Sequence, residues 1–178
     1  FFDVSDANFT SKIVSYDKLI KEYQNDSIGN KAIYEKAKLL IENEKYRTAI
    51  DMEDSLLTLD KEIYKDVSTM ITQAAIGTMK NALKKKECTS VLAISSQYKI
   101  ELSDEWDDGV YECAMKGADF LLAKTMADKN LKSKNLEQRK KWLYRYIKID
   151  FATGNYTNVI EASKELITLI AENRKSKF

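Results

Sequence analysis

Apolar residues recur at helical spacing along almost the whole chain, and no stretch alternates apolar and polar residues as a strand would. Two segments carry this pattern most clearly. The first predicts a long helix from about Lys61 to Lys84, with a face made of Ile63, Val67, Met70, Ile71, Ala74 and Thr78. The last helix has a comparable face, made of Val159, Ile160, Ser163, Leu166, Ile167 and Ile170. The sequence therefore predicts an all-helical fold.

A second pattern repeats at longer intervals. An aromatic or similar residue is followed by a small or aliphatic residue three or four positions later, and by a large apolar residue ten positions later. These anchor residues are Phe9, Tyr46, Cys88, Phe120 and Tyr156, so the intervals between them are 37, 42, 32 and 36 residues. An irregular helical bundle would produce some of this spacing by chance. Five anchors at similar intervals favour repeated helix pairs.

These anchors resemble the second-helix pattern of tetratricopeptide repeats and their looser Sel1-like relatives. The segment EKYRTAIDMEDSLL carries Tyr46 and Leu56, and GNYTNVIEASKELI carries Tyr156 and Leu166. The resemblance covers most of the chain and implies an α-solenoid of antiparallel helix pairs with about four to five irregular repeats. The proline that ends a helix in the family consensus is missing from every unit. We expect one repeat domain over residues 1–178, cut from the C-terminal part of a longer protein.

The region from 103 to 153 fits the repeat only loosely. It is compatible with a short helix pair broken at Gly117, and also with one long helix from Ser103 to about Lys129. A glycine inside a helix costs only about 1 kcal/mol. Gly117 therefore leaves both alternatives open.

Composition narrows the function. Histidine is absent, which removes the commonest general base and the commonest metal ligand. A net charge of +1 argues against a nucleic-acid partner, and the apolar runs are too short to insert into a membrane. An acidic cluster is interpreted as the solvated first turn of a helix rather than a cation site; it contains Glu101, Asp104, Glu105, Asp107 and Asp108. We predict a protein that is not an enzyme, with no catalytic residue, metal or cofactor.

Cys88 and Cys113 are the two cysteines of the chain. They lie at about equal distances from a turn expected near Ile100, so an antiparallel helix pair would place them at the same height. A disulfide follows if they also face each other, and it would indicate an oxidising compartment. The alternative is two unlinked, buried cysteines that act as small apolar residues.

Asn8 is a candidate glycosylation site, because Asn8-Phe9-Thr10 forms an acceptor tripeptide. Asp6, two positions upstream, makes it resemble the extended acceptor of periplasmic bacterial glycosylation systems. Asn25 and Asn155 begin simpler acceptors without that acid. Such tripeptides are frequent by chance, and this is the simpler interpretation of each one.

Three aromatic residues on neighbouring faces of one helix are candidate partner contacts, namely Trp142, Tyr144 and Tyr146. One neighbouring helix cannot bury all three, so some of them are available to a protein partner on a concave face. Packing between adjacent helix pairs is the simpler alternative for these rings.

Rich lysine, asparagine and isoleucine content, the candidate disulfide and the acceptor at Asn8 together resemble the C-terminal repeat region of the paralysed-flagellum protein A family. The resemblance implies a periplasmic scaffold around a flagellar motor that binds other proteins, such as a second solenoid or another motor-scaffold protein, and supports stator assembly and motility. The alternative is a cytosolic adaptor that binds a peptide or a chaperone and keeps its cysteines reduced.

Overall fold

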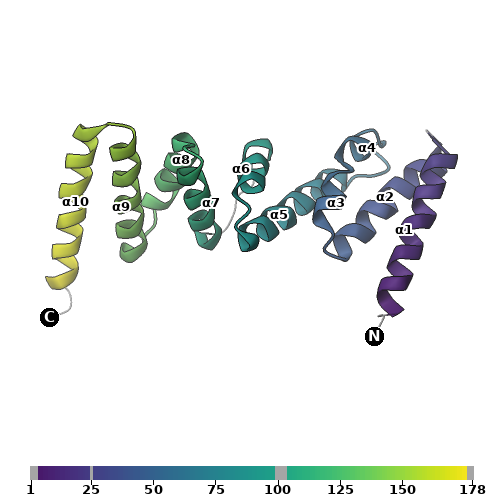
Figure 1. The fold of residues 1–178 in the computed structure, drawn as a ribbon, viewed down its shortest axis with the longest axis horizontal. Coiled ribbons are helices and arrows are strands. Elements are labelled where there is room, and N and C mark those ends of the chain that lie inside the picture. The colour runs from purple at the N-terminus through teal and green to yellow at the C-terminus, as the bar shows by residue number, and fades with distance from the viewer. Residues whose placement is uncertain (1–3, 25, 99–103, 176–178) are drawn as a thin grey trace. The chain divides into compact units, whose positions relative to one another are not determined.

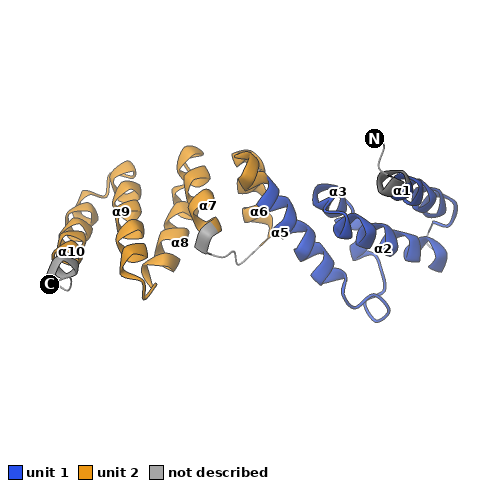
Figure 2. Cartoon of the chain, turned by 90° about the horizontal axis from the view of Figure 1, so that it is seen from below, with its two compact units in different colours: residues 1–81 blue, residues 82–178 orange. Residues whose placement is uncertain are grey.

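The computed structural model describes residues 4–24, 26–98 and 104–175. The described residues form ten helices and no strand, which confirms the prediction of an all-helical fold (Figure 1). The helices are α1 (Val4–Glu22), α2 (Ser27–Glu42), α3 (Tyr46–Ile50), α4 (Glu53–Leu57), α5 (Val67–Lys85), α6 (Cys88–Gln97), α7 (Asp104–Lys116), α8 (Phe120–Leu131), α9 (Leu136–Ala152) and α10 (Tyr156–Lys175). The chain divides into two compact units, residues 1–81 and residues 82–178, and the boundary falls within α5 (Figure 2).

In the first unit α2 is the central element, because α1, α3 and α4 all pack against it. The Asp26 side chain caps α2 by accepting the backbone N–H of Ile28. The long helix expected from Lys61 begins only at Val67 as α5. Residues before it form turns, in which the Asp60 carboxylate accepts the N–H of Glu62. Ile63 is therefore outside the helix and 70% exposed, whereas the other predicted face residues of α5 are buried.

In the second unit each helix from α6 to α10 packs against the next one along the chain. A buried cluster joins α7, α8 and α9 and contains Tyr111, Ala114, Ala123, Ala127, Trp142 and Ile149. The region from 103 to 153 resolves into separate helices, since α7 ends at Lys116 and α8 begins at Phe120. The alternative of one long helix from Ser103 to about Lys129 is therefore wrong. Ala118, with a φ of 56°, turns the chain between the two.

One backbone link occurs four times, and each time a residue with positive φ stands two positions before the next helix begins. These residues are Glu44, Lys86, Ala118 and Gly154. In every link the N–H of that residue bonds to the carbonyl three positions earlier, and the following N–H bonds to the carbonyl five positions back at 2.8–2.9 Å. This is the Schellman arrangement, which satisfies the last carbonyls of a helix. The next helix starts at Tyr46, Cys88, Phe120 or Tyr156.

Four of the five anchors are thus the first residues of α3, α6, α8 and α10, while Phe9 lies inside α1. The α3 segment differs from the expected continuous helix, because α3 and α4 are separate five-residue helices. Between them the N–H of Met52 bonds to the carbonyl of Ala49, only three residues back. This tighter bond interrupts the α-helical series.

The position six residues before the anchor is buried at all four links. It is occupied by Leu40, Ala82, Ala114 and Asp150. Asp150 is the only charged residue of this set. Its Oδ1 atom lies 3.7 Å from Lys124 Nζ, and its buried Oδ2 atom has no hydrogen-bond partner among the described residues. Asp107 is equally buried but better satisfied, because Lys129 Nζ lies 3.0 Å from its Oδ2 and Asn130 Nδ2 donates to the same oxygen at 2.7 Å.

We expect Asp150→Ala to raise the free energy of unfolding by about 1 kcal/mol, because it removes an incompletely paired buried charge and leaves Lys124 partly exposed to water. Asp107→Ala should lower it by about 2 kcal/mol, because the Asn130 amide loses an acceptor. Urea denaturation followed by tryptophan fluorescence measures both. Equal destabilisation by the two variants would contradict this assignment.

Candidate functional site

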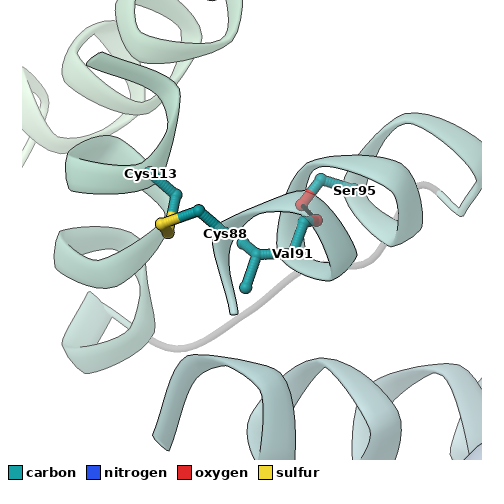
Figure 3. The surroundings of a disulfide bond; sticks show 4 residues. All are labelled: Cys88, Val91, Ser95 and Cys113. Atoms are coloured by element: carbon teal, nitrogen blue, oxygen red, sulfur yellow. Dashed lines mark hydrogen bonds between the residues drawn. A yellow bond between two sulfur atoms is a disulfide. The ribbon is translucent and has the colours of Figure 1, made fainter. Parts of the chain in front are cut away.

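The two cysteines form a disulfide that joins the start of α6 to α7 (Figure 3). Their Cα atoms are 5.0 Å apart, and no free cysteine remains. Cys113 is buried and Cys88 is half-buried. Close by, the Ser95 hydroxyl donates to the carbonyl of Val91 within α6. The prediction of a Cys88–Cys113 disulfide is therefore confirmed over the alternative of two unlinked thiols, whereas the turn expected near Ile100 lies outside the described residues.

Trp142 is buried, at 1% exposure, so its prediction as a partner contact is wrong. Its ring meets the Tyr111 ring edge-on at 5.7 Å, and the Arg145 guanidinium lies 4.4 Å above it. Tyr146 packs partly buried against the same cluster. Tyr144 is 53% exposed, with Lys148 Nζ 4.8 Å from its ring. Of the three aromatics, Tyr144 is the one that a partner could reach.

Arg145 also anchors a charged network between α7 and α9. It pairs with Asp108 and with Glu112, at 3.4 Å for the latter, and Lys141 pairs with Asp108 as well. Burial raises the pKa of the Asp108 carboxyl, but the hydrogen bonds from Lys141 and Arg145 outweigh it and leave the pKa below its ordinary value. The network therefore holds α9 against α7.

The interpretation of the acidic cluster as a solvated turn is wrong for Asp107, which is buried, and Asp108 is committed to ion pairs. Glu101 lies outside the described residues, as do the side chains of Asp104 and Glu105. Among the described residues no group of three or more cysteine or acidic side chains could hold a metal ion. None of the described helices is both long and apolar enough to cross a bilayer.

A row of exposed apolar side chains lies on α10. We call it the α10 stripe, and it consists of Tyr156, Ile160, Ser163, Ile167 and Ile170. Its four large side chains are 59%, 57%, 66% and 41% exposed in that order. Phe151 of α9, which is 64% exposed, extends the stripe, and its ring meets the Tyr156 ring at 5.8 Å.

The sequence pattern missed this stripe because it assigned all six apolar-face residues of the last helix to one buried face. In the structure Ala162 is buried and Val159 and Leu166 are half-buried, whereas Ile160, Ile167 and Ile170 face outward. The sequence feature that could have indicated the stripe is the width of the apolar surface of this helix. Apolar residues occupy more than the third of a helix surface that a single neighbour covers.

Asn8 is exposed on α1, so an enzyme can reach its side chain. Asn155 is exposed in the link before α10, where its N–H bonds to the carbonyl of Asp150. Asn25 lies outside the described residues. Comparison with known proteins gives no match of the chain to a family model, a curated protein or a solved structure.

Proposed function

We propose that this chain is a protein-interaction scaffold made of tetratricopeptide-like helix pairs stacked as an α-solenoid. The observation that carries the proposal is the fourfold recurrence of one link, with a Schellman turn before each anchor residue. The link stands before α3, α6, α8 and α10, so the same local hydrogen bonds precede the second helix of each proposed pair. Solenoids built like this use their extended surfaces to hold other proteins rather than to perform chemistry.

We also propose that the scaffold works in an oxidising compartment, such as the periplasm. The Cys88–Cys113 disulfide supports this, since intracellular thiols are normally kept reduced. Rapid alkylation of the protein in its source cells tests it. Both cysteines should resist a maleimide reagent until they are reduced. Ready modification would instead favour the cytosolic adaptor.

Photo-crosslinking in the source cells tests the scaffold itself. A photoreactive amino acid in place of the exposed Tyr144 should give a discrete adduct with a different protein, identified by mass spectrometry. The same replacement at exposed Leu121 of α8 probes a second surface, and the buried Trp142 is the control that should give none. Absence of adducts from both exposed positions would contradict an interaction role.

The resemblance to the paralysed-flagellum protein A family makes a flagellar-motor scaffold the assembly to test first. Deletion of the gene should abolish swimming, and the intact gene should restore it. Normal swimming in the deletion strain would remove the motor from the proposal while leaving the scaffold role open to the crosslinking test.

A further inference from the structure

The α10 stripe has the spacing of a helix-packing seam. Its residues follow one another at intervals of four, three, four and three positions, which keeps them in line along one face. Ala162 lies on another face of α10 and is buried, on the side that packs against α9. A helix with apolar residues on two separate faces normally has both faces covered. The structure shows a neighbour for one of them.

Equivalent positions elsewhere in the chain show what kind of element covers such a face. In the first unit, the anchor Tyr46 lies against Gly77 of α5, so closely that a Cβ atom there would overlap its ring. In the second unit, Gly109 of α7 approaches Leu83, which stands five positions before its anchor, and a Cβ there would lie 2.8 Å from Leu83 Cδ2. The covering element is therefore a helix that presents a small residue.

The corresponding places around the link before α10 are occupied by Phe151, five positions before the anchor, by the anchor Tyr156 itself, and by Ile160, four positions after it. Around the link before α8, the corresponding residues Met115 and Phe120 pack against the buried cluster that contains Trp142 and Ile149. Around the link before α10, in contrast, the side chains of Phe151, Tyr156 and Ile160 are all more than half exposed. Among the described residues no helix covers the stripe in the way that helices cover its equivalents.

We infer that a second copy of this chain covers the α10 stripe, with the two α10 helices antiparallel and related by a two-fold axis beside Ser163. In this register Tyr156 faces Ile170 of the second copy, and Ile160 faces Ile167 of the second copy. Ser163 meets its own counterpart, and its small side chain provides the close approach that glycine provides inside the chain. The stripe is thus complementary to itself, as a two-fold interface requires.

Charges next to the stripe match the same arrangement. Lys164 and Glu161 are both exposed on the side of the stripe away from the residues that face α9. In the antiparallel register Lys164 of each copy lies level with Glu161 of the other, so two symmetric opposite-charge pairs flank the seam. The stripe itself contains no charged residue, and hence the apolar contact leaves no charge buried.

Disulfide trapping tests the register directly. Both natural cysteines are already bridged, so an introduced thiol is the one free thiol of the chain. Ser163→Cys should give a covalent dimer under mild oxidation at low protein concentration. Thr168→Cys, exposed on the same helix but away from the stripe, is the matched control and should stay monomeric on a non-reducing gel. Equal crosslinking of the two variants, or none from Ser163→Cys, would overturn the proposed register.

Sedimentation equilibrium tests the dimer independently of the register. Ile167→Glu should weaken dimerisation by about 100-fold, because each copy would bury an unpaired carboxylate. Leu121→Glu on α8, where the residue is 80% exposed, should leave it unchanged, and circular dichroism should show that both variants are folded. A wild-type chain that remains monomeric at the highest concentration reached would overturn the inference. This outcome is separate from the scaffold proposal, whose crosslinks go to a different protein.

Discussion

Replacement of both cysteines by alanine is expected to lower the free energy of unfolding of the second unit by about 3 kcal/mol. The disulfide closes a loop between residues 25 positions apart, and so restricts the unfolded chain. It also joins α6 to α7 at Cys88, the anchor position that an aromatic residue occupies in the other repeats. Both tryptophans, Trp106 and Trp142, lie in residues 82–178. Tryptophan fluorescence during urea denaturation therefore reports this unit.

A reducing agent provides the matched control for this prediction. It should destabilise the wild-type protein by a similar amount and leave the alanine variant unaffected. The comparison separates loss of the bond from any packing change caused by the smaller side chains. If the wild-type transition is the same with and without reductant, the disulfide does not contribute to stability as expected.

The all-helical fold and the starts of α3, α6, α8 and α10 were predictable, because helical periodicity and anchor residues are local features of the sequence. The links between helices were harder to predict from turn residues. Three of the four residues with positive φ are Glu44, Lys86 and Ala118, and only Gly154 carries the usual signal. The Schellman hydrogen bonds compensate for the cost of this conformation in a residue with a Cβ atom. The spacing of the anchors therefore indicated where the links lie, whereas glycine marks only the link at Gly154.

The candidate surface was predicted less well than the fold, because exposure depends on which neighbour covers each face. Trp142 is buried by Tyr111, 31 positions earlier, and by Arg145, whose charge gave no hint that it would cover an aromatic ring. Ile160 and Ile167 fit the helical period as well as the half-buried Leu166 does, yet they point outward. Periodicity identifies apolar faces but does not count the neighbours that cover them.

Gly29→Ala is expected to destabilise the first unit by about 3 kcal/mol, the upper range for forcing an extra methyl group into a packed site. Gly29 is buried in the first turn of α2, and a Cβ atom there would overlap the backbone carbonyl oxygen of Tyr23. A carbonyl cannot swing aside as a side-chain end can, and the same oxygen accepts the N–H of Asp26. The methyl group can therefore be accommodated only if the Tyr23 peptide, in the link between α1 and α2, moves away from α2.

Gly154→Ala is the control, because Gly154 has the positive φ for which glycine is usually required but open space around its missing Cβ. Ala118 already holds the same place in the preceding link with a φ of 56°. This change should cost only about 1 kcal/mol. Circular dichroism follows the helices of both units during denaturation, so it measures the two variants on one scale. A larger loss from Gly154→Ala than from Gly29→Ala would mean that backbone conformation, and not the close contact of Gly29 with the Tyr23 carbonyl, limits the stability of these turns.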